Sequence, residues 1–134
     1  MNIFDVITTD HETVKKLLGQ LQDTSENASK TRQQLLEKLE KELLPHMYAE
    51  EQYFYQTLLD ESDEKKEVYE SIEEHRAAKN VLSDLHEAAF DDPRWAARLK
   101  VLKELIEHHI EEEEDDVFEI AHKVMDESRA TSAA

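Results

Sequence analysis

Hydrophobic residues recur along most of this chain at alternating steps of three and four, the spacing that places side chains on one face of an α-helix. The pattern runs through four segments, at about residues 3–25, 29–59, 63–90 and 93–127. Polar, turn-forming residues separate these segments at Asn27–Ser29, near Asp60–Ser62 and at Asp91–Pro93. The chain is therefore predicted to be all-α, with four amphipathic helices.

The clearest helix start is at Asp92, followed by a proline. Aspartate accepts a hydrogen bond from a first-turn backbone N–H, and proline fits the first turn because its missing N–H costs nothing there. Ser29 and Ser62 are weaker candidate caps. Pro45 lies inside the second segment and deletes one backbone hydrogen bond, so it predicts a kink or a local widening of that helix.

Each apolar stripe contains a histidine. The first two stripes consist of Phe4, Ile7, His11, Val14, Leu18 and Leu21, and of Leu36, Leu39, Leu43, His46, Glu50 and Tyr53. The third and fourth consist of Val68, Ile72, His75, Lys79, Leu82, His86 and Ala89, and of Trp95, Leu99, Leu102, Ile106, His109, Glu113, Val117, Ile120 and Val124. Histidine and carboxylate in a core cost several kcal/mol unless each finds a partner, and a metal ion suits both.

The composition supports one helical domain. The chain has 134 residues with one glycine and two prolines, the usage of long helices joined by short connections. This length allows one substantial core but not two. We assign residues 1–127 to the bundle and expect a disordered tail at 128–134.

Charge and cysteine content narrow the function classes. A net charge of −17 repels phosphate backbones and anionic lipid headgroups, so we expect neither a nucleic-acid nor a membrane partner. No apolar run approaches the roughly 20 residues of a membrane span, and Met1–Asp10 lacks a basic region, which predicts a cytoplasmic protein. Because the chain has no cysteine, any metal must be held by nitrogen and oxygen ligands.

The stripe histidines occur at matching depths if the helices run antiparallel. His46 and His75 lie about 15 and 14 residues from the break near residue 61, roughly 20 Å along each helix. His75 and His109 both lie about 17 residues from the break near residue 92. His11 lies about 15 residues before the break near residue 26 and His46 about 20 after it, a looser match. All four histidines can share one layer of a bundle.

Two of these histidines have a glutamate four residues later, His46 with Glu50 and His109 with Glu113. This spacing places a nitrogen and an oxygen ligand one helical turn apart on the inward face. With the other stripe histidines, the candidate metal ligands are His11, His46, Glu50, His75, His109 and Glu113. Six ligands exceed the four of one tetrahedral zinc ion, and two carboxylates can bridge a metal pair, so the set indicates two metal ions.

The fourth segment leaves an alternative open. If this helix were rotated, His108 with Glu112 or Glu114 would replace His109 and Glu113. The apolar stripe favours His109 and Glu113, and it predicts that His108 is partly exposed or supports a ligand.

The order of these residues resembles the hemerythrin-like HHE cation-binding family. The resemblance covers about residues 3–125 and is strongest in the phrases HMYAEE at His46–Glu51 and HIEEEEDDVF at His109–Phe118. It implies an up-down-up-down antiparallel four-helix bundle with a non-haem di-iron centre, bridged by carboxylates and an oxo or hydroxo group. It further implies that Glu50 and Glu113 are the bridging carboxylates and that the four histidines are terminal ligands.

The chain departs from the family's reversible oxygen carriers at two positions. Those carriers have a second histidine on the third helix where this chain has Lys79, and they place the last carboxylate at the position of Glu114. An iron short of one histidine has an extra open position. We therefore expect a di-iron protein that binds or reacts with dioxygen, peroxide or nitric oxide. An iron or oxygen sensor, or an oxygen-binding protein without turnover, is the alternative, and whether the protein is an enzyme stays open.

Other residues near the predicted centre allow more than one role. Lys79 is expected either to donate to a bound oxygen species or to extend its amine into solvent. Tyr48, Tyr53 and Tyr55 lie within about two turns of His46, and we expect them to pack in the core, with a redox or hydrogen-bonding role as the alternative.

Overall fold

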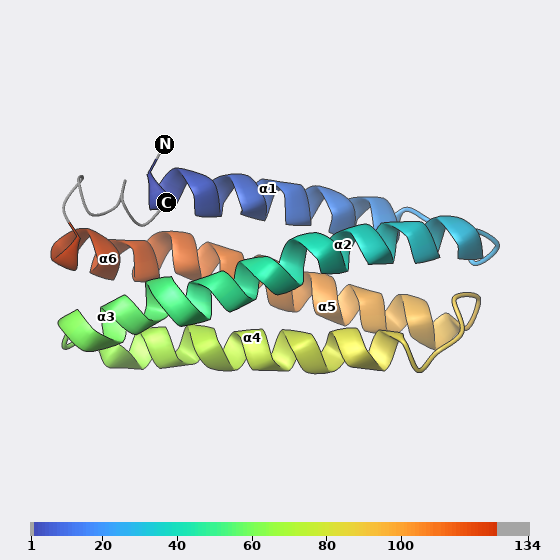
Figure 1. Ribbon diagram of the computed structural model, residues 1–134. Coiled ribbons are helices and arrows are strands. Elements are labelled where there is room, and N and C mark those ends of the chain that lie inside the picture. The colour runs from blue at the N-terminus through green and yellow to red at the C-terminus, as the bar shows by residue number, and fades with distance from the viewer. Residues whose placement is uncertain (1, 126–134) are drawn as a thin grey trace.

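Four helical rods pack side by side in the computed structural model, which describes residues 2–125 (Figure 1). The first two rods consist of α1 (Ile3–Gln22), and of α2 (Ser29–Ala49), η1 (Glu50–Tyr55) and α3 (Gln56–Glu61). The last two consist of α4 (Lys65–Leu85), and of α5 (Pro93–Glu112), η2 (Glu113–Val117) and α6 (Phe118–Val124). Successive rods run in opposite directions, with α1 packed on α2 and α5, and α4 packed on α5. This arrangement confirms the predicted all-α, up-down-up-down bundle.

The predicted helix ends were partly wrong. The first and third helices end at Gln22 and Leu85, earlier than predicted, and the second rod continues to Glu61. The chain after Leu85 leaves the helix because Phe90 turns back to pack on Trp95, with ring centroids 5.6 Å apart. The fourth rod ends at Val124, and the tail predicted at 128–134 lies outside the described residues.

The helix caps follow the sequence at one of three predicted positions. Asp92 caps α5 as expected, because its side chain accepts from the backbone N–H of Arg94 at 2.9 Å, with the proline at the first helical position. Ser29 does not cap α2, whose preceding residue makes no side-chain cap. Ser62 also does not cap α4, since its hydroxyl accepts instead from the N–H of Glu64 in the connecting loop at 3.0 Å.

Helix widening occurs at two glutamates rather than at Pro45. Pro45 lies within regular α2, and the π-helical segment begins five residues later, at Glu50. The second π-helical segment begins at Glu113, in a rod without an interior proline. A π-helical turn holds one more residue than an α-helical turn and is frequent at functional sites. In this bundle both widened turns start at a predicted bridging carboxylate.

Two apolar clusters fill the bundle above and below the histidine layer. The cluster toward the α1–α2 and α4–α5 connections includes Leu18, Leu39, Leu82, Trp95 and Leu102. The cluster at the opposite end includes Ile7, Phe54, Leu58, Val68 and Phe118. Each fully buried side chain of this size contributes roughly 1.5–3 kcal/mol, so the clusters stabilise the bundle and hold the polar layer in a dry core. Among the described residues, no helix combines the length and apolarity needed to cross a membrane.

Four positions predicted on the inward stripes face outward. Lys79 and His86 have side-chain exposures of 41% and 55%, Tyr53 is 69% exposed, and Ala89 lies in the exposed α4–α5 connection. The third helix instead buries Ser71, His75, Ala78, Leu82 and Leu85. The prediction was wrong here because the buried face of α4 includes Ala78 rather than Lys79. Alanine is small, and the sequence pattern did not indicate that it, rather than the neighbouring lysine, lies on the inward face.

Arg32 joins the two connections at one end of the bundle. Its buried guanidinium donates to the hydroxyl of Thr24 at 2.8 Å and to the Thr24 carbonyl at 3.1 Å. It also donates to the carbonyl of Phe90 and lies 4.6 Å from the ring centroid of Trp95. These contacts link the α1–α2 connection to the α4–α5 connection across the bundle.

Arg32→Ala is expected to lower the free energy of unfolding by about 2–4 kcal/mol, because two carbonyls lose their buried donor and the cation–π contact is lost. Chemical denaturation of the metal-loaded protein measures the change. Arg76→Ala is the matched control, since the Arg76 side chain is 76% exposed and forms an ion pair with Glu73, with 3.6 Å between the nitrogen and oxygen atoms. The expected change in its free energy of unfolding is below about 0.5 kcal/mol. Equal losses in the two variants would contradict the role given to Arg32.

Candidate metal centre

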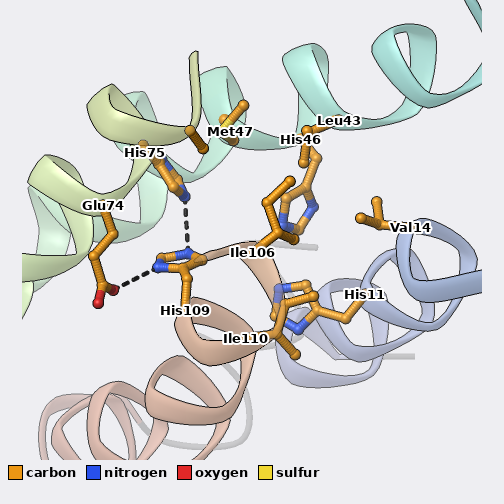
Figure 2. A pocket seen from close by; sticks show the side chains of 11 residues that line it. His11, Val14, Leu43, His46, Met47, Glu74, His75, Ile106, His109 and Ile110 are labelled. Atoms are coloured by element: carbon orange, nitrogen blue, oxygen red, sulfur yellow. Dashed lines mark hydrogen bonds and ion pairs between the residues drawn. The ribbon is translucent and has the colours of Figure 1, made fainter. Parts of the chain in front are cut away.

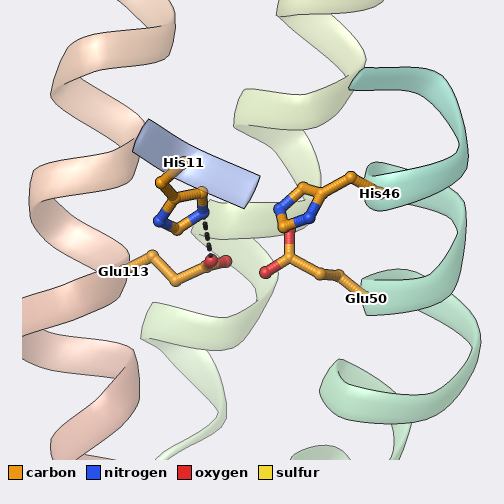
Figure 3. A group of neighbouring side chains, drawn as sticks. All are labelled: His11, His46, Glu50 and Glu113. Carbon is orange, nitrogen blue, oxygen red and sulfur yellow. Dashed lines mark ion pairs between the residues drawn. The ribbon is translucent and has the colours of Figure 1, made fainter. Parts of the chain in front are cut away.

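The six predicted ligand residues lie together in the middle of the bundle, on all four rods. They form two groups of four, and in each group the nitrogen and oxygen atoms lie within 4.8 Å of one another. The groups consist of His11, His46, Glu50 and Glu113 (Figure 3), and of His75, His109, Glu50 and Glu113. Both groups contain the same two glutamates, so Glu50 and Glu113 lie between two pairs of histidines.

The Nε2 atom of each histidine faces these glutamates. The Nε2 of His11 is 3.0 Å from Glu113 Oε1, and that of His46 is 2.9 Å from Glu50 Oε1. The Nε2 of His75 is 3.3 Å from Glu50 Oε1 and 3.0 Å from the Nε2 of His109. Separations of about 3 Å are those of neighbouring ligands around an octahedral ion with bonds of about 2.1 Å.

The Nδ1 atom of each histidine lies beside an outer carboxylate. The Nδ1 atoms and their carboxylate partners are His11 with Glu114 at 2.7 Å, His46 with Asp10 at 3.0 Å, His109 with Glu74 at 2.8 Å, and His75 with Glu51 at 3.4 Å. In His11, His46 and His109, a proton held on Nδ1 and donated outward leaves the lone pair of Nε2 directed at the centre. The outer carboxylates thereby fix the ring orientation and the tautomer that a metal ligand needs in these three residues, whereas the Nδ1 of His75 makes no hydrogen bond within residues 2–125.

Burial keeps two of these imidazoles neutral. It lowers the pKa of His75 to about 2, and it also lowers the pKa of His46. At His11 burial acts in the same direction, but the carboxylates of Glu113 and Glu114 outweigh it and raise the pKa. Neutral imidazole is the form that binds a metal ion, so His46 and His75 are available as ligands at neutral pH.

The two central glutamates are buried without sufficient protein donors. Both oxygens of Glu50 and the Oε1 of Glu113 lack a hydrogen-bond donor within residues 2–125. Burial, and then the charge of Glu113, raises the pKa of Glu50 well above its usual value. Unpaired buried carboxylates cost several kcal/mol, whereas cations would satisfy them. The donor set, with four imidazoles and two carboxylates, therefore fits a pair of divalent or trivalent metal ions.

Tyr55 is a further buried residue at this centre. Its hydroxyl donates to Glu113 Oε2 and lies 3.4 Å from the Nε2 of His75. Burial, and then the nearby glutamates, raises the pKa of Tyr55 well above its usual value. Tyr48 and Tyr53, which the sequence also predicted in the core, are exposed instead. The one signal in the sequence for Tyr55 was its position within the second rod, which did not separate it from its neighbours.

The alternative ligands of the fourth rod lie outside the two groups. The side chain of His108 is 61% exposed, and its Nε2 is 3.0 Å from Glu112. Glu114 lies beside the outer nitrogen of His11. The first turn of η2 begins at Glu113, which places this residue inward and Glu114 outward.

Lys79 does not reach the centre. Its amine lies 3.0 Å from Glu51 Oε2, and Glu51 in turn lies 3.4 Å from the Nδ1 of His75. The lysine therefore holds the outer carboxylate of one histidine rather than filling the position of a further histidine ligand.

A small cavity lies against the four histidines on the side away from the glutamates. Its volume is about 10 Å³, and Figure 2 shows the histidines with the apolar side chains that line it. These side chains include Val14, Leu43, Met47, Ile106 and Ile110. This volume corresponds to about one water molecule, so a diatomic or similarly small molecule is the largest that fits without movement of the side chains.

Comparison with known proteins finds similarity to a curated relative and to a solved structure. A protein named DNA nickase from Nostoc sp. strain PCC 7120 is 29% identical over 121 residues, a match that covers 88% of this chain and 33% of the relative. This chain thus spans about a third of that relative's length. The crystal structure of a hemerythrin HHE cation binding domain-containing protein from Mycobacterium kansasii superimposes with a TM-score of 0.86 at 24% identity, covering 99% of this chain and 80% of the other.

A model of one protein family matches nearly the whole described chain. The matched residues, 2–121, extend into all four rods and include both groups of candidate ligands. The predicted family resemblance is thereby confirmed, and with it a role in cation binding. The chain belongs to the hemerythrin HHE cation-binding domain family.

Proposed function

We propose that this protein holds a non-haem di-iron centre that binds or reacts with dioxygen, peroxide or nitric oxide. His11 and His46 would hold one iron and His75 and His109 the other, and Glu50 and Glu113 would be shared by both. The observation that carries the proposal is the sharing of both glutamates by two groups of four ligands. One metal ion would leave two histidines and at least one carboxylate oxygen unsatisfied in a dry core.

An iron pair, when bound, supplies two redox-active ions and open coordination positions for small oxidants. The chain's own residues determine what reaches that pair and how its ligands are held. The cavity beside the histidines has a volume of about 10 Å³ and a mainly apolar lining, so it has room for a molecule of a few atoms at most. The outer carboxylates beside the Nδ1 atoms of His11, His46 and His109 hold those rings with Nε2 directed at the centre.

Tyr55 is proposed as a seventh ligand. Its hydroxyl lies between His75 and Glu113, within contact distance of both. A phenolate ligand would complete the second iron without closing the cavity beside the histidines.

Tyr55→Phe is expected to retain about two irons per chain while changing the visible spectrum, because the six other ligands remain and a phenolate-to-iron(III) charge-transfer band is lost. Absorption spectra of the oxidised variant and the wild type, at equal iron content, measure the effect. Tyr53→Phe, at an exposed neighbouring tyrosine, is the matched control and should leave the spectrum unchanged. Identical spectra for Tyr55→Phe and the wild type would show that Tyr55 only donates a hydrogen bond.

Metal analysis of variants on the fourth rod tests the ligand set. His109→Ala is expected to lower bound iron to about one per chain or less, because the buried Nε2 of His109 is one of two imidazoles in its group. His108→Ala, at an exposed histidine, is expected to retain the wild-type content. The opposite result would mean that the fourth rod is rotated from the arrangement described above, and stably folded, metal-free wild type would overturn the di-iron proposal.

A sensor is the alternative within the same site. Metal-coupled folding would let the bundle report iron or oxygen to a partner without catalysis. Addition of peroxide or dioxygen to the reduced protein separates the two, since repeated turnover indicates an enzyme and a single change of state indicates a sensor or carrier. The cytoplasmic location remains a prediction.

DNA strand scission, which the name of the Nostoc relative indicates for that protein, is not part of the proposed function. This chain spans only 33% of that relative. Its net charge of −17 opposes contact with a phosphate backbone.

A further inference from the structure

A third group of candidate metal ligands lies on the outer surface of the bundle, beside the two groups at the centre. It consists of Glu74 on α4 and of His108 and Glu112 on α5, with ligand atoms that lie within 4.8 Å of one another. Glu74 and His108 each precede a ligand histidine of the centre by one residue, so they occupy the outward flanks of the same two helices. The proposed di-iron function uses neither His108 nor Glu112.

The spacing within this group suits a single bound ion. His108 and Glu112 are one helical turn apart, with 3.0 Å between Nε2 and Oε1. Neighbouring ligands of an ion bound at about 2.1 Å lie roughly 3–3.5 Å apart. The side chain of His108 is 61% exposed and that of Glu112 is 36% exposed, whereas that of Glu74 is only 18% exposed. An ion can therefore reach the group from solvent and still bind a partly buried carboxylate.

The surroundings of the group are acidic. The carboxylates of Glu74 and Glu112 come from different helices and contact each other, and this contact raises the pKa of Glu112. Glu70 and Glu73 line the same hollow between α4 and α5, where Lys66 is the one cation among the described lining residues. Two carboxylates in contact repel each other unless a proton or a cation lies between them. A divalent ion would relieve this repulsion.

The donor types indicate the class of ion. One imidazole with two carboxylates suits Zn²⁺ and similar divalent transition-metal ions, whereas Mg²⁺ and Ca²⁺ prefer oxygen ligands alone. Three protein ligands leave positions for water. Exposed ligands hold an ion more weakly than buried ones, because solvent screens the attraction. We therefore expect dialysis to remove this ion while the metals of the buried centre stay bound.

Glu74 joins this surface group to the candidate metal centre. Its Oε1 lies 2.8 Å from the Nδ1 of His109, the contact drawn in Figure 2. A carboxylate has two oxygens, so Glu74 can accept from His109 with one and bind a cation with the other. A cation on Glu74 draws negative charge away from this hydrogen bond, and such outer hydrogen bonds tune the strength of a histidine ligand.

We propose that Glu74, His108 and Glu112 bind one divalent transition-metal ion of the Zn²⁺ type, which acts on the metal centre through the contact of Glu74 with His109. Binding of the ion depends only on the three surface side chains. Its effect on the centre rests on the proposed function. Occupancy of the surface site would adjust one histidine ligand without changing the iron content.

A Zn²⁺ titration of the oxidised, iron-loaded protein tests the surface site, because the central ligands are then occupied. Calorimetry in the presence of excess Mg²⁺ is expected to show one saturable Zn²⁺ site per chain, with no loss of iron. His108→Ala and Glu112→Gln should each weaken this binding by at least about tenfold, since each removes one of three protein ligands. All three proteins should retain the same iron content.

His86→Ala is the matched control for these variants. The side chain of His86 is 55% exposed and lies 2.6 Å from Glu40, but it belongs to no group of three candidate ligands within residues 2–125. This variant should bind Zn²⁺ like the wild type. Equal losses in His86→Ala and His108→Ala, or full competition by Mg²⁺, would show only diffuse attraction of cations to an acidic surface and would overturn the site.

The visible spectrum of the oxidised centre tests the link through Glu74. Addition of Zn²⁺ to the iron-loaded wild type is expected to shift the absorption bands, with a midpoint equal to that of the calorimetric titration. His108→Ala should show no shift at the same Zn²⁺ concentration. Saturable Zn²⁺ binding without any change in the spectrum would overturn the link and leave the surface site supported.

The outcomes separate this proposal from the di-iron function. Iron-loaded wild type without a saturable Zn²⁺ site would overturn the surface site and leave the metal centre untouched. Wild type that contains no iron, but binds one Zn²⁺ more than His108→Ala does, would overturn the di-iron function and support the surface site.

Discussion

Glu113→Gln is expected to lower bound iron from about two per chain to well below one, with a loss of affinity greater than 100-fold. The reason is that Glu113 belongs to both groups of four ligands, so its substitution removes an oxygen ligand from each metal. An amide is a weaker ligand than a carboxylate and adds no negative charge to balance the cations. Metal analysis after dialysis against a weak chelator of known affinity measures the change.

Two neighbouring glutamates give graded controls for this prediction. Glu114→Gln removes the outer partner of His11 and should weaken metal binding by about tenfold to a hundredfold, which is the usual effect of such a partner. Glu111→Gln, at an exposed position, should have no effect. If Glu114→Gln loses more metal than Glu113→Gln, the last carboxylate lies five residues after His109, as in the family's oxygen carriers, and the assignment of Glu113 is wrong.

The second prediction concerns Glu50, whose substitution should have opposite effects with and without metal. Removal of the metals is expected to lower the free energy of unfolding by about 4 kcal/mol when free metal had been near 1,000 times its dissociation constant, a fall of roughly 10–20 °C in Tm. In the metal-loaded protein, Glu50→Gln should lower the free energy of unfolding, because it weakens metal binding. In the metal-free protein, the same substitution should raise the free energy of unfolding by about 1–2 kcal/mol, since it replaces an unpaired buried carboxylate.

The pH dependence of the metal-free comparison follows from the pKa of Glu50. Burial, and then Glu113, raises that pKa well above its usual value of 4.5, so the folded protein holds a proton that the unfolded chain releases. The burial of the charged Glu50 carboxylate therefore lowers the stability of the metal-free wild type by its full amount at pH values above the folded pKa. This loss of stability shrinks as the pH falls through the folded pKa toward 4.5, where the Gln variant and the wild type should have similar free energies of unfolding.

Thermal unfolding of both proteins, with bound metal and after chelation, measures this reversal. Glu40→Gln is a suitable control because Glu40 lies at a partly exposed site, paired with His86 at 2.6 Å and remote from the centre. Its effect should be small and of the same sign in both states. A Glu50→Gln variant that is destabilised equally with and without metal would show that Glu50 has a structural role independent of a cation.

The sequence by itself determined the fold and the set of residues at its centre. Steps of three and four define an apolar face regardless of what that face packs against, so four helices could be predicted, whereas their up-down-up-down antiparallel order was implied by the family resemblance. The distances from each histidine to the nearest chain break fixed its depth in the bundle, because the rise per residue of a helix is constant. This is why His11, His46, His75 and His109 could be placed in one layer of the bundle from the sequence alone.

Tertiary structure decided which neighbouring residues turn inward. The widened turns at Glu50 and Glu113 shift the helix face by part of a turn, and a uniform helical period does not include such a shift. Tyr53 consequently lies outside and Tyr55 inside, although the stripe predicted Tyr53 on the inward face. Lys79 was placed inward for a related reason, since only packing shows that the smaller Ala78 occupies the buried face of α4.

Contacts between rods were equally beyond the sequence. Each outer carboxylate, such as Asp10 for His46 or Glu74 for His109, comes from a different rod than the histidine it holds, so no local spacing connects the two. Helical periodicity determined which residues can face the core. The packing of the four rods determined which of these residues contact one another. The reason is that side-chain contact depends on distances across the bundle, which the order of residues along one helix does not specify.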